Sequence, residues 1–315
     1  MTEMIGCRLA VIAIAVGLAG CATIRPHGGA LDCGPVRLTH PRFPAGFFGG
    51  RLAGLYLDGD CLYVLRSGKR ALVPIWRGRP SPFFWAPDGR QIAGGSFVLD
   101  PRGRVVRRFR GRSLGFFASG TLLVARRSGL ATLRADGERM LVGLRRLEGV
   151  AGFRGWRLEI RAGGGWTYGR GMVAVLLHRD EPFRERVLVI GENGTVERAS
   201  PLFRVPGEVD SAVGGLDWAP DGRTLFESNT RPSSRFDHEH CLDRWSRASG
   251  YRRIFCVAKP RPRTAGHWLR LVWAADGRIA LLSNGYLVDR SGHLLPRVVR
   301  GPNSAFAFAW VRPRR

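Results

Sequence analysis

The sequence predicts an all-β fold, a six-bladed β-propeller closed by its C-terminal strand, with a ring of seven blades as the alternative. A Trp-Ala-Pro-Asp-Gly-Arg motif stands at residues 85–90 and 218–223 and returns with one change at 273–278. Short apolar runs flank each copy, and no long amphipathic pattern of helical period follows the N-terminus. Repetition of one such unit along a chain is typical of a repeat architecture.

The repeated motif itself predicts a β-hairpin. Proline at the second turn position fixes φ at about −65°, aspartate suits the third position, and glycine accepts the positive φ that follows. These residues favour a type I turn that closes through a glycine bulge. Ala275 replaces the proline in the third copy, which a type I turn tolerates.

Glycine turns that end successive units divide the chain into blades. They lie at Gly68, Gly103, Gly137, Gly194, Gly250 and Gly292. The first unit lacks an opening strand, so we expect residues 306–311 to pair beside residues 52–57 and close the ring. Residues 145–165 read as an irregular connection with room for an extra strand. The tryptophans near strand starts are expected to pack between blades: Trp85, Trp218, Trp273 and Trp310.

The hairpin motif resembles the TolB-like propeller repeat, whose usual form is Trp-Ser-Pro-Asp-Gly followed by a strand. Three copies match clearly, and the other units match in pattern. The resemblance implies a six-bladed propeller in the periplasm or outside the cytoplasmic membrane. It implies no particular function, because propellers serve binding, structural and enzymatic roles.

The N-terminus predicts export and a lipid anchor. Residues 9–20 form an apolar run that is too short to span a bilayer and suits a secretory signal. The run ends at Leu18-Ala19-Gly20-Cys21, which resembles a bacterial lipobox and implies acylation of Cys21. An ordinary signal peptide or membrane anchor with an incidental cysteine is the alternative. We therefore expect a signal peptide at 1–20, a flexible tether at 21–45 and the propeller at 46–315.

Four cysteines remain after the signal and the lipidation site: Cys33, Cys61, Cys241 and Cys256. An even number in an exported chain indicates disulfides. Cys241 and Cys256 lie symmetrically about the turn at residues 248–250, so we expect them to face each other across one hairpin. Cys33 and Cys61 would then pin the N-terminal tail to the first blade. A zinc site would require closer cysteine spacing.

The chain is strongly basic, with 50 Lys and Arg against 25 Asp and Glu and a formal net charge of +25. Such a field favours anionic partners. GC-rich coding would explain arginine in place of lysine but not the excess of bases over acids. Two alternatives stay open: a generally basic surface, or a selected anionic ligand. We expect a protein or an anionic envelope polymer as partner, contact with the membrane through the N-terminal lipid, no nucleic acid, and a monomer.

The longest connections predict one binding face. They are residues 145–165, 179–184 and 229–240, which join blades or join second to third strands. The candidate binding residues on them are Arg145, Arg146, Arg154, Arg231 and Arg235. Turns on the opposite face are short, and we expect them to shape no pocket.

Few residues suggest chemistry. His238 and His240 could begin a divalent metal site on an extended segment, although solvated histidines are the plainer interpretation and no third ligand is evident. No Gly-x-Ser-x-Gly elbow and no phosphate loop occur, and no cofactor is expected. The sequence thus favours a non-catalytic, lipid-anchored, extracytoplasmic propeller that acts as a protein-binding or envelope-associated scaffold. The alternatives are a lyase or glycosidase acting on an extracellular polymer, and a binder of anionic envelope polymers.

Overall fold

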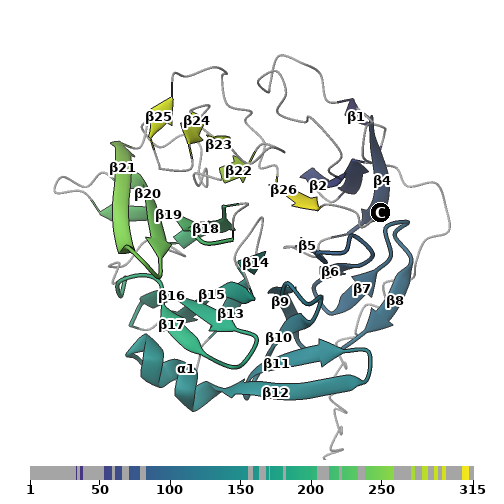
Figure 1. The fold of residues 1–315 in the computed structure, drawn as a ribbon, viewed down its shortest axis with the longest axis horizontal. Coiled ribbons are helices and arrows are strands. Elements are labelled where there is room, and N and C mark those ends of the chain that lie inside the picture. Colours follow the sequence, from purple (N-terminus) through teal and green to yellow (C-terminus); the bar gives the residue numbers. More distant parts are fainter. Residues whose placement is uncertain are drawn as a thin grey trace, which may run out of the picture. The chain divides into compact units, whose positions relative to one another are not determined.

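Short antiparallel strands make up almost all of the regular structure in the described part of the chain (Figure 1). The computed structural model describes residues 33, 36–37, 53–58, 61–65, 71–78, 83–154, 159–162, 168–169, 171–179, 182–203, 213–219, 222–232, 238–258, 271–273, 279–282, 287–289, 293–295 and 307–311. The chain divides into two units, Met1–Ala30 and Leu31–Arg315. The predicted signal peptide, Cys21 and Arg235 lie outside the described residues. Among those residues, no helix combines the length and apolar character that a membrane span requires.

The first three sheets, A to C, come from the N-terminal half of the chain, apart from the C-terminal strand β26 in sheet A. Sheet A contains β1 (Val36–Arg37), β2 (Ala53–Asp58), β3 (Cys61–Leu65), β4 (Ala71–Arg77) and β26 (Ala307–Val311). Sheet B contains β5 (Phe83–Trp85), β6 (Ile92–Gly94), β7 (Phe97–Leu99) and β8 (Val105–Arg108). Sheet C contains β9 (Arg112–Phe116), β10 (Leu122–Arg126), β11 (Gly129–Arg134) and β12 (Gly137–Gly143).

Sheets D to F complete the fold, with helix α1 (Leu144–Ala151) between sheets C and D in the chain. Sheet D contains β13 (Glu159–Ala162), β14 (Tyr168–Gly169), β15 (Met172–Arg179), β16 (Arg184–Gly191) and β17 (Val196–Arg198). Sheet E contains β18 (Val213–Trp218), β19 (Leu225–Pro232), β20 (His238–Ser246) and β21 (Gly250–Ala258). Sheet F contains β22 (Leu271–Trp273), β23 (Ile279–Leu282), β24 (Leu287–Asp289) and β25 (Leu294–Leu295).

The repeated hairpin has the predicted geometry. Gly89 has a φ of 72°, and its amide donates to the Ala86 carbonyl at 2.9 Å. Gly222 has a φ of 67° and makes the same bond to Ala219 at 2.8 Å. Gly120, with a φ of 87°, makes the same bond to Phe117 at 2.9 Å, so the first turn of sheet C has this geometry without the motif sequence. Glycine is needed at these positions because L side chains rarely adopt positive φ.

The C-terminal strand closes sheet A, as predicted. β26 pairs antiparallel with β2, with Leu55 opposite Ala309 and Gly54 opposite Trp310. Contacts between strands of neighbouring sheets follow the order of the chain. β26 of sheet A contacts β5 of sheet B, β5 contacts β9 of sheet C, and β9 contacts β13 of sheet D. β15 of sheet D contacts β18 of sheet E, and β22 of sheet F contacts β26 of sheet A. Four-stranded meanders that follow one another and close on the first form a β-propeller. The described residues form six sheets, and the number of blades in the closed ring stays a prediction.

Apolar side chains fill the spaces between neighbouring sheets. Trp85 and Trp218 are 4% and 0% exposed, so both pack between blades as predicted. The side chains of Trp273 and Trp310 are outside the described set. Between sheets C and D the core includes Leu123, Leu130, Val175 and Leu188. Burial of these side chains supplies most of the free energy that holds the sheets together.

Residues 144–151 form a helix, and the expectation of an irregular connection there is wrong. Leu147 and Ala151 of α1 are fully buried in the core between sheets C and D. The helix contacts β12 and β17, beside which Figure 1 shows it. Gly152, with a φ of 77°, ends it, and its amide donates to the Glu148 carbonyl at 2.9 Å. The extra strand expected within residues 145–165 is present as β13.

Both expected disulfides are present. Cys241 lies directly opposite Cys256 on β20 and β21, and the two are bonded. Cys33 is bonded to Cys61, and the nearby β1 pairs with the outer strand β4 of sheet A. These residues of the predicted tether are therefore held on the first sheet. Disulfides are typical of proteins in oxidising compartments outside the cytoplasm.

Candidate functional site

Two hollows lie beside the tight turns of sheets B, C and D, and the expectation that short turns shape no pocket is wrong. The C–D hollow has a volume of about 440 Å³ and lies between β11 and β12 on one side and the β16–β17 turn on the other. The B–C hollow, of about 510 Å³, lies between the first turns of sheets B and C and the ends of β8 and β11. Arg134 borders both, so the hollows adjoin across it.

A polar network fixes the rim of the C–D hollow. The Ser119 hydroxyl donates to Glu192 Oε1 at 2.6 Å, and a guanidinium nitrogen of Arg134 lies 3.4 Å from the same oxygen. The Thr121 amide donates to Ser119 Oγ at 3.1 Å. Glu192 is thus held by residues from another blade, and its charge is partly balanced by Arg134.

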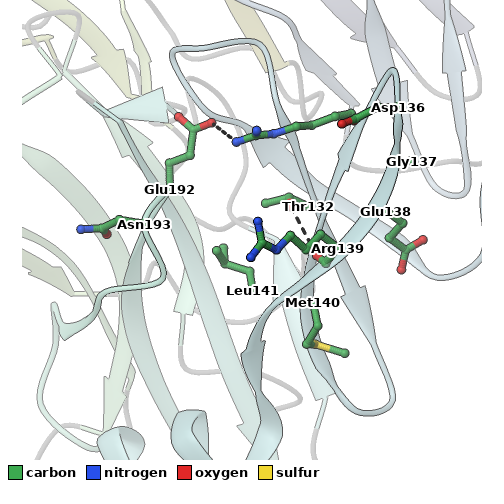
Figure 2. Close-up of a pocket in the computed structure, with 10 residues that line it drawn as sticks. Thr132, Asp136, Gly137, Glu138, Arg139, Met140, Leu141, Glu192 and Asn193 are labelled. Atoms are coloured by element: carbon green, nitrogen blue, oxygen red, sulfur yellow. Dashed lines mark hydrogen bonds and ion pairs between the residues drawn. The ribbon is translucent and has the colours of Figure 1, made fainter.

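Arg139 is the cation of the C–D hollow whose charge is least balanced. Figure 2 shows its guanidinium directed toward the space between Glu192 and Leu141. Among the described residues, that guanidinium has no hydrogen-bond or ion-pair partner. The neighbouring Glu138 does not pair with it, because the Glu138 carboxylate binds both Nε and a terminal nitrogen of Arg126, with Nε at 2.6 Å. Asp136 of the β11–β12 turn also lines the hollow, is exposed, and forms no ion pair with Arg139. A guanidinium in this position can bind a carboxylate or phosphate with two parallel hydrogen bonds.

Exposed apolar side chains border the same hollows. Met140 of β12 is 51% exposed and lines the C–D hollow, and Val106 of β8 is 54% exposed and lines the B–C hollow. The described lining residues include no histidine, cysteine or aromatic residue. Arginine beside exposed apolar surface suits recognition of a mixed acidic and apolar ligand.

The predicted binding arginines are dispersed in the structure. Arg145 and Arg146 are exposed in the first turn of α1. Arg154 is exposed, and its carbonyl accepts a hydrogen bond from Arg179. Arg231 lies on β19, where its side chain is not described. The structure therefore places Arg145 and Arg146 next to β12 in the chain and does not test the role of any of these residues.

The predicted loop at 229–240 is mostly strand. Asn229 pairs with Cys241 and Pro232 pairs with His238, so the β19–β20 ladder continues to the edge of residues 233–237. The expectation of a long loop here is wrong, because residues 229–232 and 238–240 extend the β19–β20 hairpin, whose second strand carries Cys241.

The metal hypothesis for His238 and His240 stays a prediction. Both residues lie on β20, and residues two apart in a strand share one face of the sheet. Their side chains are not described. Ligand atoms of Glu239, Cys241 and Cys256 lie within 4.8 Å of one another, but the two sulfurs are bonded to each other. A disulfide offers no thiolate to a metal.

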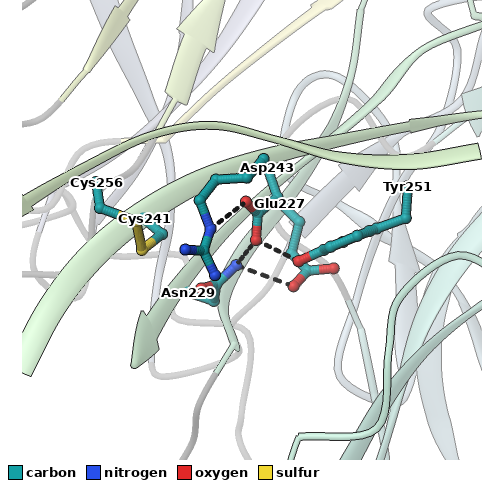
Figure 3. Close-up of a disulfide and its surroundings, with 7 residues drawn as sticks. Glu227, Asn229, Cys241, Asp243, Tyr251 and Cys256 are labelled. Carbon is teal, nitrogen blue, oxygen red and sulfur yellow. Dashed lines mark hydrogen bonds and ion pairs between the residues drawn. A yellow bond between two sulfur atoms is a disulfide. The ribbon is translucent and has the colours of Figure 1, made fainter. Parts of the chain in front are cut away.

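A buried polar cluster in sheet E gave no signal in the sequence (Figure 3). Asn229 Nδ2 donates to Asp243 at 2.6 Å and to Glu227 at 3.2 Å, and the Tyr251 hydroxyl also donates to Asp243. Glu227 and Asp243 are directly opposite on β19 and β20. These groups hold three strands of the sheet in register beside the Cys241–Cys256 disulfide.

A second buried pair joins sheets D and E. His178 Nδ1 lies 2.8 Å from Glu185 Oε1, and both side chains are fully buried. The second oxygen of Glu185 accepts the Val213 amide of β18 at 2.9 Å. Neither group lines the hollows, and the contacts indicate a structural role at the boundary between the sheets.

Two further arginines donate hydrogen bonds to the C-terminal end of α1. Arg186 donates to the Ala151 carbonyl at 2.5 Å, and Arg198 donates to the Val150 carbonyl. Burial lowers the pKa of Arg186, and the charge of Arg198 lowers it further. Cations at the C-terminal end of a helix are stabilised by its partial negative charge. This pair therefore caps α1.

No known protein family and no curated protein matches the chain. Among solved structures, the hydrazine synthase of Kuenenia stuttgartiensis aligns with a TM-score of 0.48 and 12% identity over 73% of this chain and 71% of that one. A putative 6-phosphogluconolactonase from Bacteroides uniformis aligns with a TM-score of 0.45 and 13% identity over 81% and 84% of the two chains. The periplasmic gluconolactonase of Pseudomonas aeruginosa aligns with a TM-score of 0.37 and 14% identity over 81% of this chain and 99% of that one. These scores are below 0.5, so the fold assignment rests on the strand pairing of this chain.

Proposed function

We propose that the protein is a lipid-anchored, extracytoplasmic, non-catalytic propeller of the TolB-like type, which binds an acidic region of another protein. The observation that carries the proposal is Arg139, an exposed cation directed into a hollow with no partner among the described residues. The lipobox-like end of the apolar run at Cys21 and the disulfides support the envelope location.

The binding surface in this proposal is the sheet C border, defined as Arg134, Arg139, Arg145 and Arg146. All four side chains are exposed, and they come from β11, β12 and α1, which follow one another in the chain. The net charge of +25 adds a long-range attraction for acidic partners and raises the rate of encounter. The sheet C border therefore combines long-range electrostatic attraction with one defined contact, at Arg139.

Three carboxylates line the C–D hollow, those of Asp136, Glu138 and Glu192. Glu138 is bound by Arg126, and Glu192 by Ser119 and Arg134, which leaves Asp136 as the lining carboxylate without an ion-pair partner among the described residues. Glycosidases of the usual kind need two carboxyl groups on either side of an open site. The adjacent pair Glu227 and Asp243 is buried around Asn229. These contacts favour binding over hydrolysis as the proposed role.

Capture of the native partner from detergent-solubilised membranes tests the proposal. We expect R139E to lower the captured amount at least tenfold, and the double reversal R145E/R146E to lower it by a smaller factor. The matched control is R252E, which makes the same charge change at an exposed position on β21. Equal losses in R139E and R252E would show that net charge alone drives capture and would overturn the proposed site.

An anionic envelope polymer is the alternative partner. The composition of the captured material distinguishes a protein partner from such a polymer. Treatment of the membranes with a protease should abolish capture if the partner is a protein. Capture that survives the protease and elutes as carbohydrate would overturn the choice of a protein partner.

A further inference from the structure

β12 is the outer edge of sheet C. The strands of this sheet lie in the order β12-β11-β10-β9, and within the described residues β12 pairs with β11 alone. Glu138, Arg139 and Met140 are all exposed, so this part of the strand reaches solvent on both faces. The outer edge of such a strand presents backbone N–H and C=O groups that can pair with another extended chain.

Sheet A shows that an outer blade edge of this protein accepts an extra strand. Its outermost blade strand, β4, is paired antiparallel with β1, with Val36 opposite Leu72 and Arg37 opposite Ala71. β1 belongs to the N-terminal segment, which the Cys33–Cys61 disulfide ties to β3. An added strand is therefore compatible with the packing of a neighbouring blade.

The side chains of β12 specify what an added strand would carry. Arg139 and Met140 are consecutive, so their side chains leave the strand on opposite faces of the sheet, and both border the C–D hollow because it reaches around the edge of β12. Arg139 lines the C–D hollow without a hydrogen-bond or ion-pair partner for its guanidinium among the described residues, and Met140 is 51% exposed. A paired strand that alternates acidic and apolar residues places a carboxylate near Arg139 and an apolar side chain near Met140.

We propose that residues 137–140 of β12, which precede a β-bulge at Leu141, bind an extended segment of the partner protein as an additional β-strand, with acidic and apolar residues alternating along that segment. The main chain supplies affinity and the two faces supply selectivity, as in other strand-addition complexes. A sugar polymer fits less well, since no aromatic side chain is among the described residues that line either hollow. The inference rests on the proposed function and specifies that the partner protein binds through an extended segment.

Three synthetic heptapeptides test the strand directly, with the full mature chain as the receptor. The probe is acetyl-Val-Glu-Val-Glu-Val-Glu-Val-amide with a fluorophore. The first control carries N-methyl groups on alternate residues, which removes the donors on one edge. The second has alternating L and D residues, which keeps charge and apolar content but cannot form a regular strand. We expect the probe to bind at least tenfold more tightly than either control.

Protein variants and hydrogen exchange locate the bound peptide. R139E should weaken binding of the probe at least tenfold, and R252E should change it less than twofold. Amides of residues 137–140 should become protected from exchange when the probe binds, while those of the edge strand β21 should not.

The outcomes separate this inference from the proposed function. Equal binding of all three peptides, weakened alike by R139E and by salt, would leave an acidic-protein site and overturn the added strand. No binding of the probe at millimolar concentration would also overturn the strand. Membrane capture that R139E leaves unchanged would overturn the proposed function itself.

Discussion

Gly103 and Gly120 offer a matched test of how closely sheets A and B pack. Both glycines have positive φ, 84° and 87°, at the end of equivalent tight turns. A Cβ on Gly103 would lie 1.8 Å from the Ile75 carbonyl oxygen of β4, whereas a Cβ on Gly120 would meet no atom within 4 Å. The two alanine variants therefore share the backbone penalty and differ in the clash with the neighbouring sheet.

The expected magnitudes follow from these two terms. The left-handed conformation costs about 1–2 kcal/mol for alanine, and the smaller entropy of the unfolded alanine chain offsets about 0.4–1 kcal/mol of it. G120A should therefore lose about 1 kcal/mol of unfolding free energy. G103A should lose roughly 1–3 kcal/mol more, because the added methyl group must displace backbone.

Thermal and urea unfolding measure the difference between the two variants. At about 2 °C per kcal/mol for a domain of this size, G103A should melt roughly 2–6 °C below G120A. Equal unfolding free energies for the two variants would show that the Ile75 carbonyl does not lie against Gly103, and the packing of sheet B on sheet A would be refuted.

Three further predictions concern the anchor, the disulfide and ring closure. The C21S variant should lose labelling by a clickable fatty acid, and persistent labelling would rule out Cys21 as the acylated residue. The C241S/C256S variant should lose roughly 3 kcal/mol in equilibrium unfolding, less any strain that the bond introduces; unchanged stability under oxidising conditions would contradict this. Deletion of residues 305–315 removes β26 and leaves β2 with an open edge, so the truncated chain should aggregate on mild heating. A truncated domain as soluble and as heat-stable as the full chain would refute closure.

Closure and disulfide pairing could be predicted because both follow from the spacing of turns. Turn residues can be recognised in a single sequence. A regular series of turns shows that the first unit lacks one strand and that one additional strand follows the last unit. The hairpin about residues 248–250 sets the register of its arms, which brings Cys241 opposite Cys256. The disulfide is thus fixed by the local geometry of one hairpin, whereas the pairing of β26 with β2 follows from the repetition of units along the chain.

Helix α1 was missed because its local signals are weak. It is short, Gly143 at its start provides no side-chain cap, and Gly149 lies within it. Its stability comes instead from Leu147 and Ala151 in the core between sheets C and D and from Arg186 and Arg198 of the following sheet. Such stabilisation depends on tertiary contacts that no window of the sequence reveals.

The hollows could not be predicted from turn length, for a geometric reason. The length of a turn limits how far it rises above its own sheet, whereas a hollow between blades depends on the gap between two sheets. That gap widens toward the outer strands, because blades are arranged radially. Between sheets C and D, α1 fills part of the gap with Leu147 and Ala151, and the part beside β12 and the β16–β17 turn remains open. Ser119 and Glu192, which bridge its rim, are 73 residues apart, so only the closed fold brings them together. A search for binding sites on a propeller with short turns should therefore begin at the outer borders between blades.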